Sequence, residues 1–74
     1  MTPRQMEVFS WVVAFVDRHG YSPTVREMGA RFNWSSPNAG QLYLKLFQKE
    51  GWVTAANGSG RAWTITAAGR RAAR

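Results

Sequence analysis

The sequence predicts a mainly helical α+β fold, in which three helices precede a two-stranded β-hairpin. Helix-start signals occur near Thr2, Thr24 and Ser36, and apolar residues follow them at helical spacing. After Gly51 the pattern changes to two short strand-like runs, which flank the glycine-rich segment 57–60. Because the chain has 74 residues, we expect one domain over residues 1–74.

The first helix is expected over about residues 2–19. Thr2 is a suitable cap, Pro3 suits the first helical position, and Gln5 completes a capping box. Gly20 follows the last apolar turn and is typical of a helix C-terminus. The sequence therefore predicts both ends of this helix.

The second helix is expected over about residues 24–33. Thr24 and Glu27 form a second capping box, and Asn33 is a residue that tolerates the left-handed conformation at a helix end. The third helix is expected over about 36–50, with Ser36 as its cap. Two short helices joined by a tight turn predict a helix-turn-helix.

A hairpin is expected over about residues 52–66, followed by a basic tail over 67–74 with room for one helical turn. Trp52 and Trp63 are expected to face each other across the hairpin. With the hairpin as a wing, the element order is that of a winged helix-turn-helix.

Aromatic residues at core spacing are expected to form the interior, with the four tryptophans wrapped around it. In the third helix the expected core stripe contains Gly40, Tyr43, Leu44 and Phe47. A second stripe, formed by Ala39, Leu42 and Leu46, is expected to be partly exposed. Exposed apolar stripes typically mark a protein contact or a larger core.

The charge of the chain is strongly unbalanced. The chain has ten Lys and Arg residues and four Asp and Glu residues, which gives a formal net charge of +6. This excess favours an acidic partner, and nucleic acid is the most common one. The alternative is that the charges serve solubility alone.

Several classes of function are excluded by what the sequence lacks. It has no cysteine and one histidine, so we expect no metal site and no cofactor. No spacing of a nucleophile and base, or of paired carboxylates, indicates an enzyme. No apolar run approaches the roughly 20 residues that span a bilayer, and no signal peptide is evident. We therefore expect a cytoplasmic protein without a membrane partner.

The chain from Met1 to about Ile65 resembles the DNA-binding domain of the LexA repressor family. The residues that carry the resemblance lie in four segments: Thr2-x-Arg4-Gln5-x-Glu7-Val8-Phe9, Gly20-x-x-Pro23-Thr24-x-x-Glu27, Ser36-Pro37-Asn38-Ala39, and Leu44-Lys45 with Gly51. The Ser-Pro-Asn-Ala element at the start of the third helix is the most specific of them.

The resemblance implies a recognition helix that enters the major groove of double-stranded DNA. The base-reading positions of the family match Ser36, Asn38 and Ala39, while two positions that are acidic in the family are Gln41 and Leu42 here. Carboxylates accept hydrogen bonds from cytosine, whereas glutamine pairs with adenine and leucine contacts only a thymine methyl. The operator of the family is therefore not expected to apply.

The resemblance also implies a C-terminal domain that dimerises and cleaves itself, and neither activity is expected of these 74 residues. We expect a monomer, and two origins stay open: a fragment, or a complete small regulator such as a phage-encoded one.

The leading hypothesis is a transcription regulator that reads bases with the start of the third helix and holds phosphates with basic residues elsewhere. The base-reading candidates are Ser36, Asn38, Ala39, Gln41 and Leu42. The phosphate-binding candidates are Arg26, Arg31, Lys45, Lys49, Arg61, Arg70 and Arg71. For each of them the alternative is a solvated surface position.

The second hypothesis is a regulator that uses the same fold to bind a protein, with host RNA polymerase as the expected partner. The observation that supports this hypothesis is the apolar stripe that contains Leu42 and Leu46. Because one fold serves many functions, the fold alone does not decide between the two hypotheses.

Overall fold

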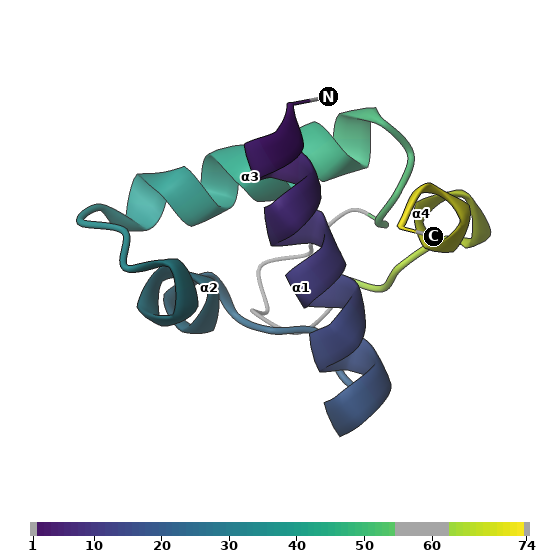
Figure 1. Ribbon diagram of the computed structural model, residues 1–74, viewed down its shortest axis with the longest axis horizontal. Helices are drawn as coiled ribbons and strands as arrows, with labels where there is room; N and C mark the ends of the chain where they lie inside the picture. Colours follow the sequence, from purple (N-terminus) through teal and green to yellow (C-terminus); the bar gives the residue numbers. More distant parts are fainter. Residues whose placement is uncertain (1, 55–62, 74) are drawn as a thin grey trace.

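The computed structural model describes residues 2–54 and 63–73 and is mainly helical (Figure 1). Its helices are α1 (Pro3–His19), α2 (Val25–Phe32), α3 (Pro37–Lys49) and α4 (Ala67–Ala72). In Figure 1, α1 crosses in front of α3, α2 lies beside the start of α3, and α4 lies toward its other end. None of the helices in residues 2–54 and 63–73 has the length and apolar character needed to cross a membrane.

The first two helices begin with the capping boxes that the sequence predicts. The Thr2 hydroxyl accepts a hydrogen bond from the Gln5 N–H over 3.1 Å, and the Gln5 side chain accepts one from the Thr2 N–H over 2.8 Å. Thr24 and Glu27 form the same pair of bonds, with the same two lengths. Each box satisfies two N–H groups that have no partner inside the helix.

The ends of α1 and α2 also follow from their residues. Gly20 ends α1 in the left-handed conformation, with φ of 80°. Asn33 ends α2 in the same conformation, with φ of 58°, and its N–H donates to the Gly29 carbonyl. Glycine and asparagine adopt this conformation at low cost, so the chain turns sharply after each helix.

The core lies where the three longer helices meet the segments on either side of residues 55–62. The Phe9 ring of α1 lies 4.9 Å from that of Phe47 in α3 and 4.7 Å from that of Trp52, measured between centroids. Such tilted ring pairs add to the free energy gained by burying apolar area. The buried apolar residues are Val8, Phe9, Val12, Met28, Phe32, Leu44, Phe47, Val53 and Trp63.

The β structure of the described residues is one antiparallel bridge, between Val53 and Ile65. The Thr54 N–H donates to the Thr64 carbonyl over 2.9 Å, and the Thr66 N–H donates to the Trp52 carbonyl over the same distance. The predicted turn and strand segments within 55–62 lie outside the described residues. The two-stranded wing therefore stays a prediction, whereas the helical part of the predicted fold is confirmed.

The bridge corrects the expected pairing of the two tryptophans. Its register pairs Trp52 with Thr66, so Trp52 and Trp63 are not opposite each other. The side chain of Trp63 is instead part of the core, where the residue is 2% exposed, rather than wrapped around it. Alternating spacing predicts which residues of a strand share a face, but it does not fix which residue of the partner strand lies opposite, and the observed register differs from the expected one.

The basic tail forms a helix, α4, which packs against the rest of the protein. Thr66 caps it: its hydroxyl accepts from the Gly69 N–H and donates to the Gly51 carbonyl over 2.6 Å. Gly69 itself is buried. A Cβ there would overlap the Trp52 carbonyl oxygen and lie 3.1 Å from Phe9, so α4 docks closely only because residue 69 has no side chain.

We predict that Gly69→Ala lowers the free energy of unfolding by about 1–3 kcal/mol, because the added methyl overpacks a backbone contact. Gly29→Ala is the matched control, since nothing lies within 4 Å of a Cβ at that helical position. It should raise stability by roughly 0.5–1 kcal/mol. Urea titrations followed by circular dichroism measure both changes, and equal stability of the Gly69→Ala variant and the wild type would contradict the packing described.

Candidate nucleic-acid interface

The helices α2 and α3 pack together through a glycine. A Cβ on Gly40, in the second turn of α3, would lie only 2.6 Å from the Cγ1 of Val25 and 3.4 Å from the Trp34 ring. Any larger residue would push α3 away from α2. Gly40 therefore sets the separation of the two helices.

A stack of aromatic rings sets the angle of the turn between α2 and α3. The Trp34 ring, in the turn, is nearly parallel to Tyr43 of α3, with 4° between the planes and 5.0 Å between centroids. It also stacks with Phe32 at the end of α2, at 5.4 Å and 20°. Trp34 is half-buried and acts in packing, which agrees with the prediction that core packing is its main role.

Ser36 begins α3 as the sequence predicts. Its hydroxyl accepts a hydrogen bond from the Asn38 N–H over 3.2 Å. Both residues are exposed. The N-terminal end of a helix carries unpaired N–H groups and a partial positive charge, so it attracts an anion such as a phosphate.

One face of α3 is exposed along its whole length. At 100° per residue, positions 38, 42, 45 and 49 lie within about 60° of one another, and 41 lies beside them. The core-facing residues Gly40, Leu44 and Phe47 are buried on the opposite side. We call the exposed side the α3 face; its residues are Asn38, Gln41, Leu42, Lys45 and Lys49, and all five are exposed.

The predicted second apolar stripe is divided by the structure. Ala39 and Leu46 are half-buried, and Leu46 packs against the core. Leu42 is 66% exposed. The α3 face thus carries one leucine rather than an apolar stripe. Leu46 lies on a side of the helix that packs against the core.

The helix α2 carries one arginine in its first turn and one in its last turn. Arg26 and Arg31 are both exposed. The guanidinium carbon of Arg31 lies 4.9 Å from the centre of the Phe32 ring, and that of Arg4 lies 5.0 Å from the same ring. Such cation–π contacts hold the guanidinium groups at fixed places on the surface.

Arg4 is not among the predicted phosphate-binding residues, because the sequence indicates it only as part of the segment that resembles the family. The Glu7 carboxylate, whose Oε1 lies 2.6 Å from the Arg4 guanidinium, raises the pKa of that group above its ordinary value. The i, i+3 spacing of Arg4 to Glu7 was the available signal for an ordered side chain.

The basic residues of α4 lie at the opposite end of α3 from Ser36 (Figure 1). Arg70 forms an ion pair with Asp17 of α1, with 2.9 Å between the charged atoms, while Arg71 is exposed. The two predicted phosphate ligands of the tail are thus not brought together with the start of α3. Arg61, the predicted ligand of the wing, lies outside the described residues.

None of the four acidic residues is among the residues of the α3 face. Glu7 pairs with Arg4, Asp17 pairs with Arg70, and Glu27 forms the capping box of α2. Glu50 follows the last residue of α3. The face from Asn38 to Lys49 therefore has two positive charges and no negative one.

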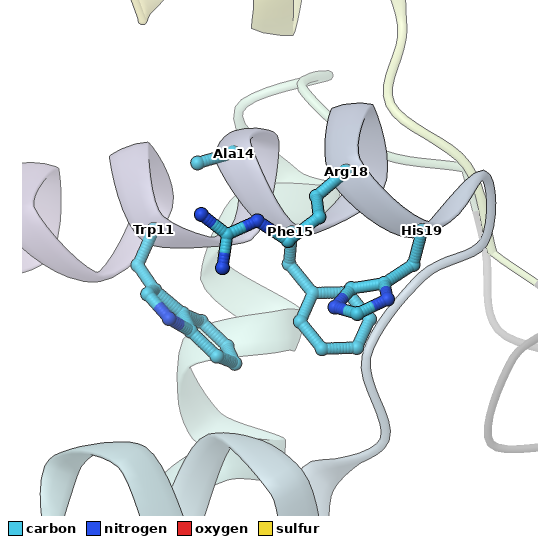
Figure 2. Close-up of a pocket in the computed structure, with 5 residues that line it drawn as sticks. All are labelled: Trp11, Ala14, Phe15, Arg18 and His19. Carbon is cyan, nitrogen blue, oxygen red and sulfur yellow. The ribbon is translucent and has the colours of Figure 1, made fainter.

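A small cavity lies on the side of α1, as Figure 2 shows. Its volume is about 160 Å³, and its lining is formed by Trp11, Ala14, Phe15, Arg18 and His19. The His19 ring lies 4.3 Å from Phe15 and 5.6 Å from Tyr21, between centroids. These ring contacts join the end of α1 to the following loop, and among the described residues no three potential metal ligands cluster there or elsewhere.

The closely packed pair α2 and α3, with a polar and basic outer face on α3, defines a helix-turn-helix protein. The family comparison agrees with this class. Residues 1–62 match the model of the LexA DNA binding domain. The chain belongs to this family, and membership supports a DNA-binding transcription regulator.

Curated relatives of the chain are LexA repressors. The chain is 34% identical to the LexA repressor of Desulfatibacillum aliphaticivorans, over 88% of this chain and 32% of the relative. The repressor of Thermotoga neapolitana is 35% identical, over 89% of this chain and 33% of the relative. The repressor of Anaeromyxobacter dehalogenans strain 2CP-1 is 33% identical, over 97% of this chain and 32% of the relative. The chain therefore spans about a third of the length of these relatives.

The orientation of α3 predicts that substituting two of its leucines changes the free energy of unfolding by very different amounts. Leu44→Ala should lower the free energy of unfolding by about 2–5 kcal/mol, because it leaves a cavity in the core. Leu42→Ala should change it by no more than about 0.5 kcal/mol, because the side chain is mostly in water. Urea titrations of the two variants measure this, and a large loss of stability in Leu42→Ala would show that α3 is rotated.

Proposed function

We propose that the chain regulates transcription by binding duplex DNA, with the α3 face in the major groove and Ser36 at its leading end. The observation that carries the proposal is the composition of that face: two amides, two lysines and no acid, exposed on a helix whose opposite side is buried. A major groove about 12 Å wide admits one α-helix. Membership of a family of DNA binding domains supports the same function.

The base-reading role falls to the first two turns of α3. Asn38 and Gln41 present amides, which bond adenine through its N6 and N7 atoms. Leu42 presents an apolar group to the base edges. Ser36, which caps the helix, is proposed to contact DNA at this leading end together with the adjacent N–H groups, because a helix N-terminus attracts phosphate. Ala39 is half-buried and limits how closely the helix approaches the bases.

The phosphate-binding role falls first to the basic residues nearest to that face. Lys45 and Lys49 lie on it, and Arg26 and Arg31 project from α2. We propose that Arg61, on the expected wing, also contacts a phosphate. Arg70 and Arg71 contact phosphates only where the duplex extends to α4, and Arg70 then has to leave its ion pair with Asp17.

A single helix-turn-helix of this size covers one half-site. Proteins of this class gain affinity by pairing two half-sites through a dimer. We propose that these residues by themselves act as a monomer, and bind one half-site more weakly than a paired protein does.

Each lysine of the α3 face should contribute to the salt dependence of binding. Lys45→Ala and Lys49→Ala are each expected to lower the slope of log K against log salt concentration by about 0.9, since one phosphate contact is lost. Arg18→Gln removes the same charge from α1 near its far end and should leave the slope unchanged. Fluorescence anisotropy with a labelled duplex at several salt concentrations measures the slopes. Equal slopes in all four proteins would contradict the assignment.

A second candidate function is binding to a protein, with RNA polymerase as the proposed partner. The exposure of Leu42 favours it, because an apolar side chain on an otherwise polar face suits a protein contact. The inward packing of Leu46 weakens it, because one leucine provides a small apolar area.

Substitutions on the α3 face distinguish the two functions. If the chain reads DNA, the double change Asn38→Ala and Gln41→Ala should lower affinity for a specific duplex by about tenfold or more, because amide–adenine pairs contribute roughly 1–3 kcal/mol each. A protein-binding regulator should tolerate the amide changes and lose regulation with Leu42→Asp. Anisotropy and a reporter assay of transcription, run on the same variants, measure the two results.

A further inference from the structure

Leu42 occupies an unusual place for an apolar residue. Among the described residues, the large apolar side chains classed as exposed are Leu42 and Tyr21, and Leu42 is the more exposed, at 66%. It lies one helical turn after Asn38 and beside Gln41, near the middle of the α3 face. It contributes little to the core, since the buried residues of α3 are on the opposite side.

The chemistry of the major groove offers one kind of apolar group. Adenine, guanine and cytosine present hydrogen-bond donors and acceptors there, whereas thymine adds a methyl group at C5. A leucine that meets a donor or acceptor would remove it from water without a partner, which is unfavourable. A leucine that meets the thymine methyl removes apolar surface of both groups from water, which is favourable.

We propose that Leu42 reads the C5-methyl of a thymine, so that the half-site of this chain is of an A·T-containing class. This proposal rests on the proposed function and names the DNA sequence class for it. The neighbouring amides agree with it, because Asn38 and Gln41 suit adenine. Four residues of α3 rise about 6 Å along the axis. Because base pairs are about 3.4 Å apart, Asn38 and Leu42 meet pairs one or two steps apart.

A methyl-reading leucine has a further consequence. The methyl of 5-methylcytosine occupies the same C5 position of the pyrimidine ring as that of thymine. Leu42 carries no donor or acceptor with which to distinguish the two bases, so it should accept 5-methylcytosine where it accepts thymine. Unmethylated cytosine and uracil, which lack the methyl, should both be disfavoured there.

The surroundings favour DNA over a protein as the group that covers Leu42. Lys45 and Lys49 continue the same face, and their charges suit flanking phosphates. Leu46, the residue that would extend an apolar patch from Leu42, packs inward instead. A single leucine among amides and lysines matches the edge of a T·A pair better than the larger apolar centre of a protein interface.

The test starts with selection of bound sequences from a random duplex pool by the full 74-residue chain. In the selected duplex each thymine is replaced singly by uracil, and dissociation constants are measured by anisotropy for the wild type and Leu42→Ala. We expect one thymine at which uracil weakens wild-type binding by about fourfold, as the loss of one buried methyl predicts. Leu42→Ala should bind the thymine and uracil duplexes equally.

At that thymine, the base pair is then changed to 5-methylcytosine·G and to C·G. For the wild type the methylated duplex should bind more tightly than the unmethylated one by the same factor of about four. For Leu42→Ala the two should bind equally. Gln41→Ala is the matched control, because it lies on the same face and should keep the thymine–uracil difference while binding more weakly overall.

The outcomes separate this proposal from the proposed function. Selection of no sequence would overturn DNA reading itself. Selection of a sequence at which no thymine responds to uracil, or at which Leu42→Ala responds as the wild type does, would overturn the methyl contact alone. In that case Leu42 would be left for a protein partner, and the DNA-binding function would stand.

Discussion

The close contact between α2 and α3 determines what the outer surface of α3 can do. Gly40 lets the two helices approach until Val25 and Trp34 contact its backbone, and the stacked rings of Phe32, Trp34 and Tyr43 hold the turn between them. A helix held on one side by shape has little freedom to rotate about its axis. The residues on its opposite side are then presented in one arrangement, which a binding face that reads a partner in detail requires.

The same rings extend this constraint to the rest of the protein. Tyr43 contacts Phe47, and Phe47 contacts Phe9 of α1 and Trp52 after α3. A chain without cysteine has no disulfide to stabilise it, so dense aromatic packing supplies much of its stability. The buried Gly69 brings α4 against this cluster, and thus the tail becomes part of the core structure rather than a loose basic arm.

The charges are divided between structure and surface. Glu7 and Asp17 pair with arginines, and Glu27 caps α2, so three of the four acids of the chain have partners within the protein. Exposed ion pairs of this kind contribute little to stability, because water and salt screen them. Their larger effect is on the distribution of charge, because the lysines of α3 are left without acidic neighbours on their face. The face that carries the two amides therefore has a positive charge of its own, from Lys45 and Lys49.

Local signals in the sequence determined the starts and ends of the helices, since capping by Thr2, Thr24 and Ser36 and the left-handed Asn33 depend only on neighbouring residues. They also determined the excess of positive charge and the family. Tertiary structure alone decided the register that separates Trp52 from Trp63, the inward packing of Leu46, and the pairing of Arg70 with Asp17. These features depend on which elements meet and how closely, and that is set by the simultaneous packing of residues far apart in the chain, which no local pattern contains.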